Sequence, residues 1–170
     1  MSNILIVPNT LLRKKACPIK NVGKEEILLS KNMIKIMNAA PGVGLAATQL
    51  GELKRIIVIN IQDPEIKKDN SYALFNPQII WRSKNTVIME EGCLSVPKQF
   101  AEIERPEKIK FKFLNNLNKE QEKEAAGFEA RVVQHEVDHL DGKLFIDYLS
   151  NLKRNIIIKK VKKLKKMGEI

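Results

Sequence analysis

The chain has 170 residues, of which 44% are hydrophobic and 29% charged, and this composition excludes a disordered protein and fits one globular domain. No apolar run approaches the roughly 20 residues that span a bilayer, residues 1–10 do not resemble a signal peptide, and two cysteines are too few for a disulfide framework. Since neither a membrane span nor a signal peptide is recognised, we expect a cytoplasmic protein that makes no membrane contact. The net charge is +10.

The first predicted element is a helix over residues 24–40. Leu29, Met33 and Ile36 fall on one face at helical spacing, and Pro41 ends the pattern. The helix is therefore expected to cover a core with that face.

The middle of the chain predicts short strands. They are residues 55–60, 73–75, 79–81, 86–89 and 109–114. In the last of these, Ile109, Phe111 and Phe113 alternate with lysines, which indicates a strand with one face in water. Residues 63–71 form a polar loop by composition.

Two more helices are predicted, over residues 125–140 and 150–167. In the second, Ile157, Val161 and Leu164 recur at helical spacing. Residues 151–170 hold eight basic side chains and one acid, so this basic C-terminal helix carries +7 of the net +10. One helix, several strands and two helices predict a single α+β domain over residues 1–170, with helices set against antiparallel sheet.

The sequence HEVDH at residues 135–139 is the strongest functional signal. Residues four apart on a helix share a face, so His135 and His139 can bind one metal ion. Glu136 then lies beside the ion, where it can handle the proton of a water. A surface helix that carries two histidines by chance is the alternative.

A catalytic site of this kind usually has three protein ligands and one open position. Two metallopeptidase patterns would supply a histidine at position 145 or a glutamate near residues 156–160, but Phe145 and an acid-free segment stand there. Cys93, which follows Gly92, remains, and a thiolate suits Zn²⁺ or Fe²⁺. Cys17 has no motif around it and is predicted to be a small buried side chain.

Three segments resemble the signature motifs of peptide deformylases, in the family's order and at about its spacing. They are GVGLAATQ at residues 42–49, EGCLS at residues 91–95 and QHEVDHL at residues 134–140. The resemblance implies a compact α+β fold, with antiparallel sheets around a central metal-binding helix. It also implies a hydrolase that removes the formyl group from the N-terminal methionine of nascent polypeptides and releases formate.

The resemblance assigns the metal ligands and the catalytic groups. Cys93, His135 and His139 would bind one divalent ion, Fe²⁺ in the cell, which Zn²⁺, Ni²⁺ or Co²⁺ can replace. Glu136 would be the general base and acid, while Gln49 and the backbone N–H of Leu94 would form the oxyanion hole.

Substrate contacts are also implied by the resemblance. The residues are Val43, Gly44, Met89, Glu91, Gly92, Phe128 and Val132. Val43, Gly44 and Gly92 would align the substrate backbone as an added strand. The methionine side chain would enter a pocket that is formed by Val43, Met89, Phe128, Val132 and His135.

Three neighbouring residues leave alternatives open. Glu91 is a candidate for a structural pair with Arg105 behind the cysteine loop. Arg131 lies either at the rim of the substrate groove or in solvent. Phe100 stands where many members of the family carry a basic or polar residue, so peptide contacts beyond methionine are expected to differ.

The basic segment 151–170 resembles the C-terminal helix with which bacterial deformylases contact the ribosome, and we expect its binding to weaken steeply with salt. A solvated cationic face on a docked helix is the alternative. For the whole chain, the alternatives are a histidine-pair metallopeptidase, a deformylase-like relative with other N-acyl substrates, and a non-enzymatic RNA-binding module. No DNA partner is expected.

Overall fold

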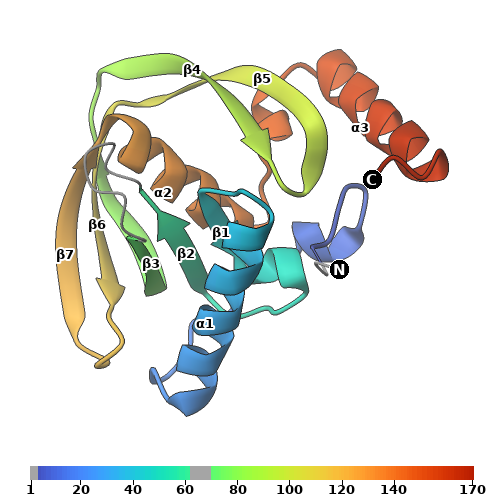
Figure 1. The fold of residues 1–170 in the computed structure, drawn as a ribbon. Coiled ribbons are helices and arrows are strands. Elements are labelled where there is room, and N and C mark those ends of the chain that lie inside the picture. The colour runs from blue at the N-terminus through green and yellow to red at the C-terminus, as the bar shows by residue number, and fades with distance from the viewer. Residues whose placement is uncertain (1–3, 62–69) are drawn as a thin grey trace.

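The computed structural model describes residues 4–61 and 70–170. No helix in this part of the chain has the length and apolar composition of a membrane span. Within the described residues, three α-helices and seven strands follow one another (Figure 1). They are α1 (Lys24–Ala39), β1 (Gly44–Ala46), β2 (Ile56–Asn60), β3 (Ser71–Arg82), β4 (Thr86–Cys93), β5 (Val96–Pro106), β6 (Lys108–Leu114), β7 (Glu120–Ala126), α2 (Gly127–Leu140) and α3 (Asn151–Lys166).

The strands form two antiparallel sheets. The larger has five strands in the order β1-β2-β3-β6-β7, and β4 and β5 make a separate two-stranded hairpin. Short 3-10 helices at Thr10–Arg13, Ala47–Leu50 and Phe145–Tyr148 connect the larger elements. The predicted α+β class, with antiparallel sheets around a central helix and helices near both ends, is confirmed.

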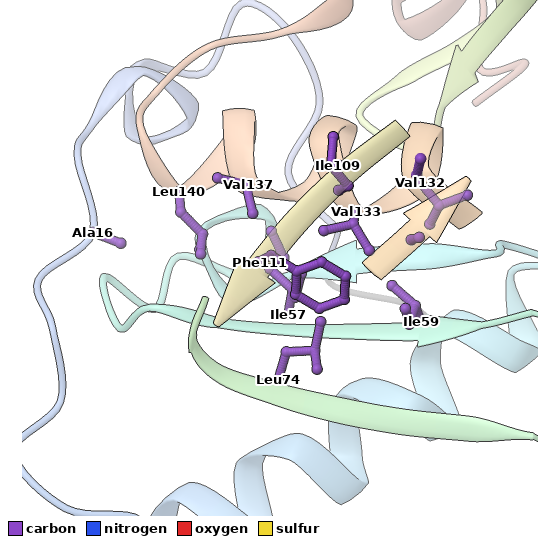
Figure 2. Packing of buried hydrophobic residues seen from close by; sticks show 13 residues of the cluster. Ala16, Ile57, Ile59, Leu74, Ile109, Phe111, Val132, Val133, Val137 and Leu140 are labelled. Carbon is purple, nitrogen blue, oxygen red and sulfur yellow. The ribbon is translucent and has the colours of Figure 1, made fainter. Parts of the chain in front are cut away.

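Strand β2 is buried on both faces, which explains its unbroken apolar sequence. Ile57 and Ile59 belong to a core cluster with α2, in which Val133 packs near Phe111 and Leu74 (Figure 2). The alternate residues of β2 form a second cluster with the methionines of α1. Helix α2 is therefore held against one face of the sheet, and α1 covers the other.

A third core cluster holds the hairpin β4–β5 against the C-terminal part of the chain. Val96 and Ile103 of β5 pack with Phe145 and with Ile157 and Val161 of α3. In Figure 1 the hairpin arches above α2, and α3 lies at the outer side of β5. The apolar stripe predicted in the basic segment thus docks on β5 and turns the lysines outward.

Several predicted boundaries are wrong. Residues 73–75 and 79–81 belong to the one strand β3, which continues through register shifts near Asn76, whose φ is +50°. Residues 125 and 126 end strand β7 instead of starting α2. Of the predicted loop at 63–71, residues 63–69 lie outside the described residues, and Ser71 begins β3.

Cys17 is exposed, so its prediction as a small buried side chain is wrong. Its backbone N–H donates to Leu53 O and its carbonyl accepts from Arg55 N, while the preceding Ala16 takes the place in the core. The segment is thus fixed by backbone pairing, which leaves the cysteine side chain outside.

Candidate active site

The two histidines of α2 meet the cysteine of β4. Cys93 Sγ lies 3.2 Å from His139 Nε2, and one ligand atom from each of Cys93, His135 and His139 lies within 4.8 Å of the other two. Metal–ligand bonds of about 2.1 Å to nitrogen and 2.3 Å to sulfur place the ligands of one tetrahedral ion roughly 3.5 Å apart. The spacing of these three side chains therefore fits a single divalent ion.

The surroundings of the two imidazoles differ. Burial lowers the pKa of His135, but its hydrogen bonds with Cys93 and Glu91 outweigh burial and raise the pKa well above its usual value, so a metal would displace a proton there. His135 Nδ1 donates to Glu91 Oε2 at 2.9 Å, because a carboxylate only accepts, and this leaves Nε2 for a metal. Burial and the neighbouring His135 lower the pKa of His139 well below its usual value. His139 is therefore neutral, as a metal ligand must be.

Glu91 is the hub of a buried charge cluster behind His135. Its carboxylate also accepts from Arg105 Nη2 at 3.0 Å and from Arg131 Nη1 at 2.6 Å. Burial raises the pKa of Glu91, but the hydrogen bonds from His135 and Arg105 outweigh it and lower the pKa to about 2. Glu91 thus stays an anion, and its predicted pairing with Arg105 is observed.

Glu136 sits beside the ligand set with a free carboxylate oxygen. It is buried, and Oε2 has no hydrogen-bond partner within the described part of the chain. Burial raises the pKa of Glu136 to about 7, although the charge of His135 opposes this. A buried carboxylate with a pKa near neutrality can both take and return a proton.

The Gln49 amide is fixed in orientation by three contacts. Its Oε1 accepts from Ala46 N at 2.8 Å, and its Nε2 donates to Ser95 Oγ at 3.0 Å and lies 3.6 Å from Cys93 Sγ. The first contact determines which end of the amide is the donor. The donor end therefore faces the metal ligands.

A cleft of about 450 Å³ opens onto these groups. One wall comes from the start of β1 and the residues before it, and the other from the end of β4 and the start of β5. Helix α2 contributes the floor. The cleft is large enough for a small extended ligand and leads to the ligand set.

A family profile described as polypeptide deformylase matches residues 1–155. The chain is also 51% identical over 165 residues to the peptide deformylase of Pelagibacter ubique, which covers 97% of this chain and 95% of that protein. The chain belongs to the polypeptide deformylase family. With the ligand set described above, this membership makes it a hydrolase with peptide deformylase activity on formylated peptides, as the sequence predicted, and not a metallopeptidase or an RNA-binding module.

Solved deformylase structures share the fold. The crystal structure of the peptide deformylase from Ehrlichia chaffeensis superposes with a TM-score of 0.92 at 37% identity and covers 98% of both chains. A structure of peptide deformylase from the same organism in complex with actinonin gives a TM-score of 0.89 at 40% identity, over 94% of this chain and 95% of that one.

Most residues predicted for this deformylase line the cleft. They are Val43, Gly44, Gln49, Glu91, Gly92, Cys93, Leu94, Phe128, Val132, His135 and Glu136. His139 is buried behind them, and Met89 lies outside the lining, 36% exposed on β4. Arg131 lines the cleft and is buried, so its solvent alternative is wrong.

Four further residues of the site were missed from the sequence. Ser95 orients Gln49, and Asp138 and Tyr148 bind Arg105. Phe145 stacks on the His135 ring with the centroids 6.1 Å apart. Ser95 and Asp138 lie inside the recognised motifs, so their position carried a signal, whereas Phe145 and Tyr148 had none beyond their apolar character.

Proposed function

We propose that Glu136, Gln49 and Leu94 carry out the hydrolysis, beside a divalent ion held by Cys93, His135 and His139. The observation that supports this most directly is the unpaired Glu136 carboxylate oxygen at a cleft that reaches three candidate ligand atoms. When bound, a divalent ion in such a site acidifies water and polarises a carbonyl.

The protein groups divide the remaining work. Glu136 takes a proton from the attacking water and returns it to the amine that leaves when the C–N bond of the formyl group breaks. Negative charge develops on the formyl oxygen, and the Gln49 amide donates to it together with the backbone N–H of Leu94. Formate and a free N-terminal amine result.

The substrate would lie extended between two strand edges. β1 is an edge strand of the larger sheet, β4 belongs to the hairpin, and Val43, Gly44 and Gly92 line the cleft between them. Backbone hydrogen bonds to such edges hold a peptide without regard to its side chains.

The N-terminal methionine side chain would enter the apolar end of the cleft. Phe128, Val132 and His135 line it from α2. Alternation along β4 puts Met89 on the same face as Glu91, so we place Met89 at the rim of this pocket.

We further propose Fe²⁺ as the cellular ion, and one thiolate and two imidazoles are ligands that suit it. The same ligands suit Zn²⁺, Ni²⁺ and Co²⁺, which could replace the iron. We also propose that residues 1–170 act as one catalytic domain in the cytoplasm, and that the lysine face of α3 binds the ribosome. Support for the last point is the outward position of the lysines, since Ile157 and Val161 dock on the hairpin.

Oxygen-free purification followed by metal analysis and a formate assay on formyl-Met-Ala-Ser tests the site. We expect close to one ion per chain, and loss of both ion and formate release in Cys93→Ser. A Cys93→Ser protein that keeps the ion with unchanged affinity would overturn the ligand set.

A further inference from the structure

The hairpin β4–β5 forms a small sheet of its own. It carries Cys93 and one wall of the cleft, but it shares no backbone ladder with the five-stranded sheet among the residues that the structure describes. Apolar contacts with α3 and the 3-10 helix at Phe145–Tyr148 support its outer side. Backbone hydrogen bonds anchor it at two places, from Val7 N to Ser95 O at the tip (2.9 Å) and from Gly127 N at the start of α2 to Glu107 O just after β5 (3.0 Å). Between these two places, the hydrogen bonds described below that join the hairpin to α2 come from side chains.

One side chain of α2 reaches both strands of the hairpin. Arg131 lies one turn before His135, and its Nη2 donates to Val87 O of β4 at 2.6 Å. Its Nη1 donates to Ile103 O of β5 at 2.9 Å and to the Glu91 carboxylate at 2.6 Å. A planar guanidinium can hold these three acceptors at once because its donors diverge in a fixed fork.

A second arginine makes the reciprocal contact. Arg105 belongs to β5 and reaches α2, where Nη1 donates to Asp138 Oδ2 at 2.8 Å. Both arginines bind Glu91, which in turn accepts from His135. The hairpin and the helix are thus cross-connected by two buried guanidinium groups that share one carboxylate.

We propose that Arg131 is a positioning residue that sets how closely the hairpin approaches α2, and thereby how closely the thiolate of Cys93 approaches the two imidazoles. The proposal rests on the metal site assigned above. Loss of the guanidinium removes one donor from each of two backbone carbonyls and one partner from Glu91, while Arg105 still holds that carboxylate. The hairpin then swings more freely, and the thiolate loses its fixed place.

Arg131→Met tests this, because methionine keeps an unbranched apolar stem against the cleft and lacks every donor. Arg55→Met is the matched control: Arg55 Nη1 donates to Asp141 Oδ1 at 2.7 Å and so ties the other end of α2, away from the hairpin. Each protein is loaded with Co²⁺, and the thiolate-to-cobalt absorption band and the rate of ion release to a chelator are measured.

We expect Arg131→Met to shift or weaken the band and to release the ion about 10- to 100-fold faster, as is typical when a residue behind a ligand is lost. Arg55→Met should leave both readouts unchanged even if it unfolds at lower denaturant. The same band and rate in Arg131→Met as in the parent would overturn the proposal, and so would equal changes in the two variants.

Arg131→Lys decides the matter if the methionine variant does not fold. An ammonium keeps the charge beside Glu91 but lacks the planar fork, so ion release should be faster than in the parent, and an equal rate overturns the proposal. Absence of any thiolate band in the parent protein would overturn the ligand set itself, and the role of Arg131 with it. The two failures are therefore distinguishable without an activity assay.

Discussion

Gly44 leaves the space that the Glu136 carboxylate occupies. A Cβ at position 44 would lie 2.4 Å from Glu136 Oε1, closer than any real Cβ contact. Strand β1 is buried at this point, so the backbone of Gly44 has little room to retreat. The glycine is required by the position of the Glu136 carboxylate, and not by a turn.

Gly44→Ala should therefore displace Glu136 and lower kcat/KM by about 100-fold or more, within the range that a general base contributes. Formate release and metal content measure this, and the ion should be retained. Gly42→Ala is the control, because the one close approach of its Cβ would be to Leu94 Cδ1 at 2.8 Å, the end of a flexible side chain, while Leu94 Cγ and Met37 Cγ would lie at 3.5 Å. Equal effects of the two substitutions would contradict the argument.

Glu136→Gln should remove the proton acceptor with little change of volume. We expect kcat to fall by about 10²- to 10⁴-fold with the ion still bound. Glu129→Gln serves as the control on the same helix, since Glu129 binds Tyr72 and Lys123 outside the cleft. A loss in Glu136→Gln of less than tenfold would mean that another group moves the proton.

Gln49→Ala should cost about 2.7–4 kcal/mol of transition-state stabilisation, the usual effect of losing one oxyanion donor. The loss should appear in kcat. Ser95→Ala should lower kcat less, because it leaves the Gln49 donor in place but removes the partner that orients it. If Gln49→Ala raised only KM, its role would be substrate binding and not stabilisation of the oxyanion.

Glu91→Ala should destabilise the fold by about 3–5 kcal/mol, because it leaves the buried Arg105 and Arg131 without their shared anion. Equilibrium unfolding in denaturant measures the change. Glu25→Ala removes the exposed carboxylate 3.9 Å from Lys54 Nζ and should have little effect. Similar midpoints for the two variants would contradict a structural role of the cluster.

Exchange of the exposed lysines of α3 for glutamine should weaken ribosome co-sedimentation at low salt while formate release from a short peptide stays unchanged. The residues are Lys159, Lys160, Lys162, Lys163, Lys165 and Lys166. Removal of the whole segment is less informative, because Ile157 and Val161 complete a core with β5. Co-sedimentation equal to that of the parent would end the ribosome proposal.

Local patterns predicted the parts of the site that one helix defines. His135 and His139 share a face of α2 and belong to the ligand set, as their spacing predicted, and Glu136 lies beside them and lines the cleft. Cys93 came from a distant segment, and only the failure of the metallopeptidase patterns and the family motifs pointed to it.

The end of strand β7 and the burial of Arg131 depend on contacts between distant segments, and the sequence did not predict them. Strand β7 has a mostly exposed sequence with little alternation, so nothing marked residues 125–126 as strand. Arg131 resembles any charged residue on a helix until the hairpin is placed over it. Its burial is a property of the docked hairpin, and the residue's own neighbours in the sequence carry no sign of it.

The ligand set also has a consequence for an unfinished protein. Cys93 and His139 stand 46 positions apart, and they belong to the two-stranded hairpin and to helix α2, respectively. In a chain that has formed α2 but in which the hairpin is not yet packed against it, the two imidazoles have no thiolate beside them. The complete ligand set therefore forms only when the hairpin has packed on α2, and we expect no hydrolysis by a partly folded chain.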